Sequence, residues 1–216
     1  MSIQTMLVSL SQAFLTTLAI FFLTLLGSLP LGLVVYFARK SRFSPLRWLT
    51  KVYIAIMRGT PLMLQMFAIY FAPYYVFGIS LTPDSKWTAC VVAFIINYAG
   101  YFAEIYRSGI QSIPRGQYEA AEVLGYSGAQ TFCRIVLPQV VKRILPPMGN
   151  EIITLVKDTS LANTIANKEI IMMAKEYSAK GLIWPLFSTA LFFLVFVGAL
   201  TILFNWAEKK LDYFRC

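Results

Sequence analysis

Five long apolar stretches constrain this chain more than any other feature of its sequence. They cover residues 13–38, 54–77, 87–101, 144–165 and 182–206. An α-helix needs about 20 apolar residues to cross a bilayer, and lipid satisfies no backbone hydrogen bonds, which leaves only helices and closed barrels. Charged residues make up 13% of the chain, about half the usual share in soluble domains. We therefore predict an all-α integral membrane protein with about five transmembrane helices.

Basic residues are grouped beside three of these stretches, and the formal net charge is +9 at pH 7. Such residues gather on the cytoplasmic side of membrane proteins, so the pattern indicates orientation in a lipid bilayer and not nucleic-acid binding. With five spans all three groups fall on one side, which predicts a multi-pass protein of the cell (inner or plasma) membrane, with its N-terminus outside and its C-terminus in the cytoplasm. The groups are Arg39, Lys40, Arg42, Arg47 and Lys51; Arg107, Arg115, Arg134, Lys142 and Arg143; and Lys209, Lys210 and Arg215.

The residues that most enzymes use are missing. No histidine occurs, and Cys90, Cys133 and Cys216 are far apart, which excludes His-based triads and the common zinc sites. No Gly-x-x-x-x-Gly-Lys-Ser/Thr loop is present to hold a nucleotide phosphate. We therefore expect no catalytic residue, no metal and no cofactor on this chain, and if ATP drives the protein, another polypeptide binds it.

The segment between the third and fourth stretches, about residues 111–138, is amphiphilic and is predicted to form an elbow of two short helices. Residues 117–124 favour a helix, and Gly125 can adopt the left-handed conformation that ends it. Ser127 and Gln130 have the spacing of a capping box, which predicts a second helix over residues 131–137 that ends at Pro138. Periodicity alone also allows an amphipathic hairpin lying on the lipid headgroups.

A spaced motif runs through the elbow: Glu119-Ala120-Ala121, three residues, Gly125, nine residues, Ile135, one residue and Leu137-Pro138. It resembles the cytoplasmic signature of permease subunits of ATP-binding-cassette (ABC) importers. Further segments resemble the branch of that family that transports polar amino acids, and the resemblance covers about residues 18–214. These segments are Arg58-Gly59-Thr60-Pro61-Leu62, residues 101–110 and residues 155–161. Residues 97–100 are more polar than this branch leads us to expect, and residues 163–180 are unspecific.

The resemblance implies a single transmembrane permease domain over residues 1–216 that pairs with an identical or similar permease chain. Two cytoplasmic ATPase subunits would bind ATP, and an extracytoplasmic binding protein would deliver an amino acid. Closure of the ATPase subunits would pull the two elbows together and rotate the spans. Glu119 would anchor the fold of the loop and Gly125 would permit its bend. The other residues expected to couple to the ATPase are Ala120, Ala121, Tyr126 and Ser127.

The fourth stretch holds charges that are costly inside a bilayer. Pro146-Pro147 can occupy the first turn of a helix, which would place Lys157 and Asp158 near mid-membrane at about 1.5 Å of rise per residue. These neighbours point about 100° apart on a helix, so at least one needs a partner elsewhere. One interpretation is a structural pair with a neighbouring chain, and the other is a substrate path in which Asp158 meets the substrate amino group. The path residues are Glu151, Lys157, Asp158, Thr159 and Ser160.

Three charged residues near the cytoplasmic boundary are expected to be structural or to form a gate. Arg58 is expected to begin a helix, where its side chain either reaches the membrane interface or contributes to an inner gate. Glu104 and Arg107 are three residues apart on one helical face, so we expect them to pair.

Two other functions compete with an ATP-driven importer. A secondary transporter driven by an ion gradient would use Glu104, Glu151 or Asp158 as a proton or sodium site, but five spans without an internal repeat argue against it. A scaffold that only recruits a partner through the elbow would not need the charged pair Lys157-Asp158. The sequence does not name the amino acid, since the two carboxylates near mid-membrane favour a cationic one and Lys157 offsets them.

Overall fold

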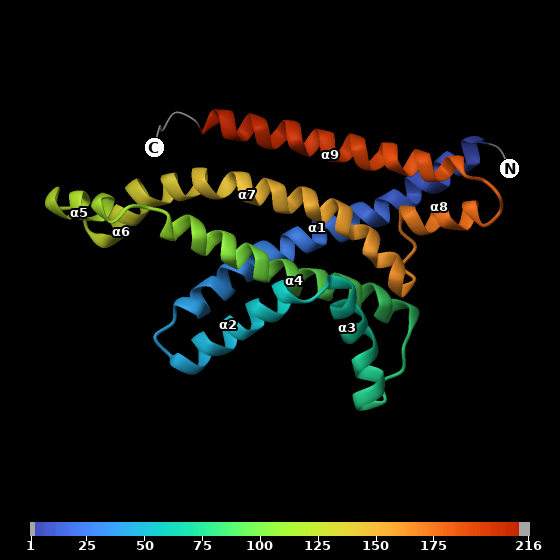
Figure 1. Ribbon diagram of the computed structural model, residues 1–216, viewed down its shortest axis with the longest axis horizontal. Coiled ribbons are helices and arrows are strands. Elements are labelled where there is room, and N and C mark those ends of the chain that lie inside the picture. Colours follow the sequence, from blue (N-terminus) through green and yellow to red (C-terminus); the bar gives the residue numbers. More distant parts are fainter. Residues whose placement is uncertain (1–2, 212–216) are drawn as a thin grey trace.

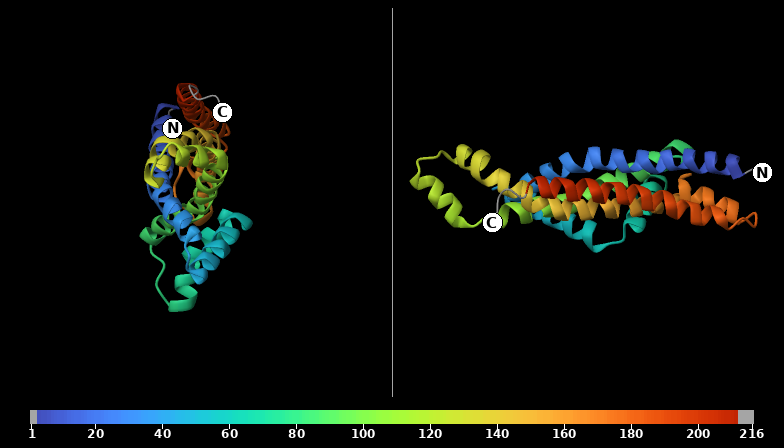
Figure 2. Two further views of the ribbon diagram at one scale, coloured as in Figure 1. Left: turned by 90° about the vertical axis from the view of Figure 1, so that its left-hand side faces the viewer. Right: turned by 90° about the horizontal axis from the view of Figure 1, so that it is seen from above.

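Four long helices run side by side along an elongated molecule in the computed structural model, which describes residues 3–211 (Figures 1 and 2). They are α1 (Ile3–Lys40), α4 (Pro83–Gln111), α7 (Leu137–Asp158) and α9 (Trp184–Lys210). Helix α1 packs against α4, α4 against α7, and α7 against α9. The described residues form helices and no strand, so the predicted all-α class is confirmed.

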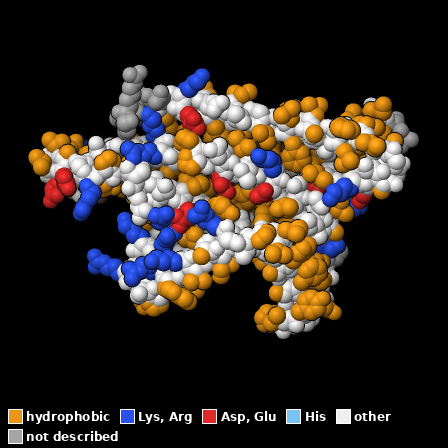
Figure 3. Space-filling view, viewed as in Figure 1, with side chains coloured by type: hydrophobic (Ala, Val, Ile, Leu, Met, Phe, Trp, Pro, Cys, Tyr) orange, Lys and Arg blue, Asp and Glu red, His pale blue; other side chains and the backbone are white. Residues whose placement is uncertain are grey.

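One end of the bundle carries the elbow together with most of the predicted basic groups. The C-terminal ends of α1, α4 and α9 meet the N-terminal end of α7 there, and the segments between α4 and α7 project beyond them (Figures 1 and 2). The last turns of α1 and α9 hold Arg39, Lys40, Lys209 and Lys210. Figure 3 shows Lys and Arg side chains gathered over this half of the molecule. Arg215 lies outside the described residues.

Three helices are long and apolar enough to cross a membrane, with ranges Ile3–Lys40, Asp84–Gln111 and Trp184–Lys210. They correspond to the first, third and fifth predicted spans, and each is longer than predicted. The second span is a bent pair of helices that counts as a fourth only if the pair crosses as one unit. Helix α7 contains most of the fourth predicted span, but charged residues interrupt its apolar sequence. They include Lys142, Arg143 and Glu151. Composition thus supports three or four spans, and the total of five stays a prediction.

Helices α2 (Ser44–Gly59) and α3 (Leu62–Phe77) are bent by 113° against each other, so the predicted span over residues 54–77 contains a break in its helix. Pro61 causes the break, because a proline disfavours helical conformation in the residue before it, and Thr60 is extended with φ −125° and ψ 148°. Arg58 consequently lies in the last turn of α2. The prediction that Arg58 begins a helix is therefore wrong.

Two buried amide side chains satisfy the backbone at this break. Gln65 Nε2 on α3 donates to the carbonyls of Met57 and Thr60, both at 3.1 Å. Asn97 Nδ2 on α4 donates to the Met57 carbonyl at 3.0 Å and to Gln65 Oε1 at 2.9 Å. A bilayer offers such groups no water to bond. The polar residue at position 97, unexpected from the sequence, therefore stabilises the bend against α4.

Replacing Asn97 with leucine is expected to lower the free energy of unfolding by about 2 kcal/mol, because the buried Gln65 oxygen loses its donor. Thermal denaturation of the purified chain in detergent would show this as a lower midpoint. Asn150→Leu, at an exposed position of α7, is the matched control and should leave the midpoint nearly unchanged. An unchanged midpoint for Asn97→Leu would contradict the role assigned to the network.

Helix α4 runs through the core and so positions the polar residues described below. Phe94, Tyr98 and Phe102 on α4 are almost fully buried. Two glycines let neighbouring helices approach closely: a Cβ at Gly32 of α1 would lie 3.0 Å from the Phe102 Cβ, and one at Gly100 would lie 3.1 Å from the Met57 Cβ. The side chains that follow along α4 are therefore fixed relative to both α1 and α2.

The chain stays helical from the elbow into the fourth stretch. A π-helical segment, η1 (Thr131–Val136), leads directly into α7, so the predicted helix end at Pro138 is wrong. Pro138 occupies the first turn of α7, where its missing N–H costs little. Pro146 and Pro147 lie inside α7 and do not begin a helix. The reason is that the residues before these prolines are already helical, and packing against α4 and α9 stabilises the helix through them.

After Asp158 the chain tightens into a 3₁₀ helix, η2 (Thr159–Ile165). It turns at Ala166, whose φ is 60°, and enters α8 (Ile170–Ser178). The carboxylate of Glu169 caps α8 by accepting from the N–H groups of Ile171 and Met172, both at 2.8 Å. Helix α8 packs against α1 and α9 at the end of the bundle opposite the elbow (Figure 1).

Candidate functional site

The elbow has the local structure that its sequence predicts. Helix α5 (Arg115–Val123) ends at Gly125, whose φ is 73°. The N–H of Tyr126 bonds the Ala121 carbonyl at 3.0 Å and that of Gly125 bonds the Glu122 carbonyl at 2.9 Å, which is the Schellman pattern. Ser127 and Gln130 form the predicted capping box at the start of α6 (Gly128–Gln130). The tight bend and the start of a second helix are therefore as the sequence predicts, although that helix continues through η1 into α7.

Apolar side chains are exposed at the tip of this bend. Val123 is 88% exposed and Leu124 72%, and the elbow that carries them projects past the end of the bundle (Figure 2). A groove of about 570 Å³ separates the elbow from α1 and is lined in part by Tyr36, Tyr118 and Tyr126. Exposed apolar patches of this kind mark interaction sites.

The motif residues of the elbow differ in exposure. Ala121 is buried, Tyr126 is half-buried, and Glu119, Ala120, Gly125 and Ser127 are exposed. Within residues 3–211 the Glu119 carboxylate has no hydrogen bond or ion pair, so its role as an anchor of the loop stays a prediction. The exposed set is what a partner at this end of the bundle would meet.

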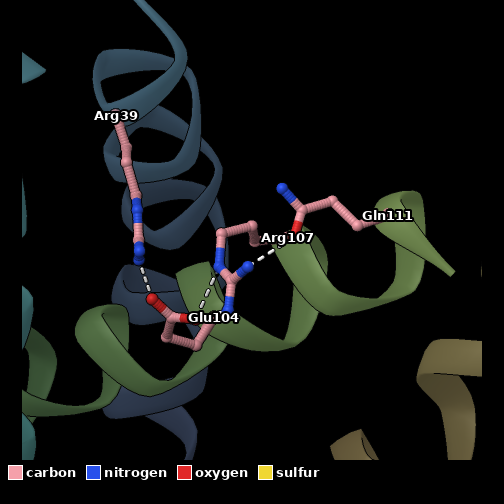
Figure 4. A network of polar contacts seen from close by, with 4 residues as sticks. All are labelled: Arg39, Glu104, Arg107 and Gln111. Carbon is pink, nitrogen blue, oxygen red and sulfur yellow. Dashed lines mark hydrogen bonds and ion pairs between the residues drawn. The ribbon is translucent and has the colours of Figure 1, made fainter.

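A charged cluster joins the ends of α1 and α4 (Figure 4). Glu104 Oε2 lies 2.6 Å from Arg107 Nη2 and accepts from Arg107 Nε at 2.7 Å, which confirms the predicted pair. Glu104 Oε1 pairs with Arg39 Nη1 of α1, and Arg107 Nη1 donates to Gln111 Oε1. Sequence analysis missed Arg39, because no local pattern brings α1 beside α4. One carboxylate thus pairs with two arginines, and the three side chains together keep a net charge of +1.

Replacing Glu104 with glutamine is expected to destabilise the fold by about 3 kcal/mol, because two arginines would keep their charges and lose their shared carboxylate. The Glu104 side chain is only 12% exposed, so water replaces it poorly. The thermal midpoint of the purified chain measures the effect. Glu176→Gln is the control, since Glu176 lies 4.0 Å from Lys168 with both side chains exposed, and such a pair contributes about 0–1 kcal/mol. Equal shifts for both variants would refute the assignment.

An open groove of about 440 Å³ lies beside this cluster, between α2, α4 and α7. Its lining includes Arg58, Tyr101, Glu104, Asn150 and Glu151. The Arg58 guanidinium lies 5.5 Å from the centroid of the Tyr101 ring, within cation–π range. Figure 3 shows acidic and basic side chains among hydrophobic ones in the middle of the molecule. The groove therefore presents both signs of charge to a solute.

Asp158, at the end of α7, has its partner on α4. The Tyr98 hydroxyl donates to Asp158 Oδ2 at 2.7 Å, so Asp158 is partnered outside its own helix, as predicted. Lys157 is exposed, and Ser160 is half-buried. Thr159 is fully buried and its hydroxyl donates to the Val156 carbonyl at 2.6 Å, so it faces the interior of this chain. Sequence analysis missed Tyr98, although residues 97–100 had already stood out as too polar.

The described residues offer no gathering of three or more Cys, Asp or Glu side chains that could hold a metal ion. The candidate site consists instead of polar and charged side chains on α2, α4 and α7 and an apolar elbow at the end of the bundle. Such groups can bind, orient and pass a polar solute and can transmit a movement from a partner.

A comparison with family models matches residues 28–213 to the binding-protein-dependent transport system inner membrane component. The chain belongs to this family. It is 34% identical over 206 residues to the L-cystine transport system permease protein TcyB of Bacillus subtilis (strain 168), covering 94% of this chain and 86% of the relative. It is 36% identical to the probable glutamine ABC transporter permease protein GlnM of the same organism, covering 93% and 92%.

Solved structures of ABC transporters have the same fold. A chain of an amino acid ABC transporter with histidines superposes with a TM-score of 0.86 at 29% identity, covering 97% of this chain and 99% of that one. A chain of the MetNI methionine ABC transporter in an inward-facing conformation superposes with a TM-score of 0.72 at 16% identity, which shows the fold alone. The resemblance to ABC permeases inferred from the elbow motif is thereby confirmed, and the protein is an inner membrane component.

Proposed function

We propose that this permease is the membrane subunit of an ATP-driven amino acid importer and forms its translocation path. The observation that carries the proposal is the family match over residues 28–213, together with relatives named as permeases for cystine, glutamine and arginine. Because those names differ, the proposal is made for amino acids as a class. One of these relatives, GlnM, is named as a probable ABC transporter permease, so an ion-gradient mechanism is not favoured.

The elbow is proposed to contact a separate ATPase subunit, which would bind the ATP. Its projection beyond the bundle and its exposed Val123 and Leu124 support this assignment. The contact set consists of Glu119, Ala120, Ala121, Gly125, Tyr126 and Ser127, although the buried Ala121 would act by shaping the loop. The chain itself would carry out no covalent chemistry.

The remaining partners are proposed to be a second permease chain and an extracytoplasmic amino acid-binding protein. The elbow and the basic ends of α1 and α9 lie at one end of the bundle, which supports a cytoplasmic location for that end. The N-terminus would then lie outside and the C-terminus in the cytoplasm.

The substrate path is proposed to follow the groove that holds Arg58 and Glu151 toward Asp158. A zwitterionic amino acid carries both charges, and the groove offers both signs. Asp158 would meet the substrate amino group, with Ser160 and the exposed Lys157 beside it, and the buried Thr159 would support their backbone. Glu104 and Arg107 would form the structural inner boundary of this path.

Uptake of labelled amino acids into proteoliposomes tests the proposal. The vesicles would hold this chain, its co-purifying ATPase and the binding protein, with ATP on the side of the ATPase. ATP-dependent accumulation of one or more amino acids is the expected result. Flux that follows an ion gradient without ATP would overturn it in favour of a secondary transporter.

A further inference from the structure

An apolar groove of about 520 Å³ lies between α1, α2 and the middle of α4, away from the elbow and the polar path. We call α1 and α2 together the hairpin, and this groove the hairpin groove. Its only polar side chains are satisfied internally, since Thr50 Oγ1 donates to the Leu46 carbonyl at 2.7 Å and the Tyr53 hydroxyl donates to the Ile96 carbonyl. An occupant therefore finds hydrocarbon surface and no hydrogen-bonding group. The other lining residues are Leu31, Val34, Val35, Ala38, Leu49 and Ile96.

The surface around the hairpin groove is suited to lipid. Val34 is 62% exposed and Leu49 60%, so both walls of the groove present aliphatic side chains outward. Helix α2 adds Trp48, 65% exposed, and Phe43 at its start is 64% exposed. Aromatic side chains of this kind are enriched where a membrane meets water. This face consequently has an apolar part beside an interfacial part.

Uncompensated positive charge lies at the turn between the two helices of the hairpin. Lys40, Arg42, Arg47 and Lys51 are all exposed, whereas Arg39 shares the carboxylate of Glu104 with Arg107. No Asp or Glu precedes Asp84 in the sequence, so the helices of the hairpin supply no counter-charge. Figure 3 shows basic side chains gathered over this part of the molecule. An anionic group at a membrane surface gains about fivefold in affinity from each such cation.

We infer that the hairpin groove binds an acyl chain of an anionic phospholipid, whose phosphate lies at the basic turn between α1 and α2. A free phosphate has no apolar part to fill the groove. A zwitterionic lipid has no net charge, so the four cations add little to its affinity. A second copy laid symmetrically on this face would bring like charges together. An anionic lipid places its acyl chain in the apolar groove and its phosphate at the basic turn. It would also fix α2, which precedes the break at Thr60, relative to α1.

Lipid retention tests the inference without requiring transport. The full-length chain, purified in detergent and stripped of lipid, would be given equal amounts of phosphatidylglycerol and phosphatidylcholine with identical acyl chains. Native mass spectrometry then counts bound lipid. We expect phosphatidylglycerol to be retained at least tenfold over phosphatidylcholine. Equal retention of the two lipids, or displacement by glycerol phosphate, which has the headgroup without the chains, would overturn the inference.

Matched variants separate the groove from the charges. Ala38→Trp fills the groove and should abolish selective retention, whereas Ala199→Trp fills an uncharged apolar groove of about 370 Å³ beside α9 and should not. Arg42→Gln with Arg47→Gln should weaken retention about 25-fold at roughly fivefold per charge, while Lys209→Gln with Lys210→Gln should leave it unchanged. The charge variants replace exposed residues, so they remain informative if Ala38→Trp fails to fold. Unchanged lipid retention in Ala38→Trp would refute a lipid in this groove. So would a mass of two protein copies that is present in the unmodified chain and lost only in Ala38→Trp, because a second copy would then occupy the groove.

Discussion

ATP-driven uptake is expected to fall about tenfold when Gly125 is replaced by valine, with the chain still inserted and purifiable. Gly125 has a φ of 73°, a conformation that costs other residues about 1–2 kcal/mol and that a β-branched residue adopts as an outlier. A cost of 1.4 kcal/mol lowers the equilibrium constant between the bent and unbent elbow tenfold. A Cβ at this position would meet nothing within 4 Å, so the variant tests the bend and not the packing.

Two controls make the Gly125 result specific. Gly125→Asn should retain most uptake, because asparagine tolerates the left-handed conformation. Gly116→Ala lies on α5 in equally open space without a positive φ, and it should also retain uptake. Co-purification of the ATPase with each variant, measured beside uptake in proteoliposomes, reports whether the elbow still binds its partner. Full uptake and full co-purification in Gly125→Val would show that the bend does not couple the two subunits.

Asp158→Asn is expected to raise the amino acid concentration for half-maximal uptake by about 10-fold to 140-fold, while ATPase activity persists. A hydrogen bond to a charged group contributes about 1.5–3 kcal/mol, and each 1.4 kcal/mol is tenfold in affinity. Asparagine keeps the shape of the side chain and can still accept from the Tyr98 hydroxyl, which lies 2.7 Å from Asp158 Oδ2. The substitution therefore removes the charge and leaves the contact with α4 in place.

Tyr98→Phe and Lys157→Gln complete this test. Tyr98→Phe removes the hydroxyl that orients Asp158 and should produce a smaller loss, since the carboxylate charge remains. Lys157 is exposed, so Lys157→Gln should change uptake little if Asp158 alone meets the substrate amino group. Wild-type uptake by Asp158→Asn would leave Asp158 a purely structural residue.

Local features of the fold could be predicted from the sequence because neighbouring residues encode them. The bend at Gly125 and the capping box of Ser127 and Gln130 depend on contacts within a few residues, and the structure has both. The pair of Glu104 and Arg107 follows from their separation by one helical turn. The ABC permease class was inferred from the resemblance of the elbow motif to that family, and the family match confirms it.

Helix boundaries near prolines were less predictable. Pro61 breaks the second apolar stretch, whereas Pro146 and Pro147 continue within α7. The local preference of proline is the same in each case. What differs is the surrounding structure, since the carbonyls freed near Pro61 are bonded by Gln65 and Asn97, and α7 is held between α4 and α9.

The sequence by itself determined that this chain is an all-helical membrane protein with an elbow, since apolar length, charge distribution and turn chemistry are written in consecutive residues. Only the tertiary structure decided which distant side chains meet: Arg39 with Glu104, Tyr98 with Asp158, and Asn97 with Gln65. Each pair joins two helices, and which residues face each other across helices depends on their crossing and rotation. Those quantities follow from packing the whole bundle, which no local pattern specifies.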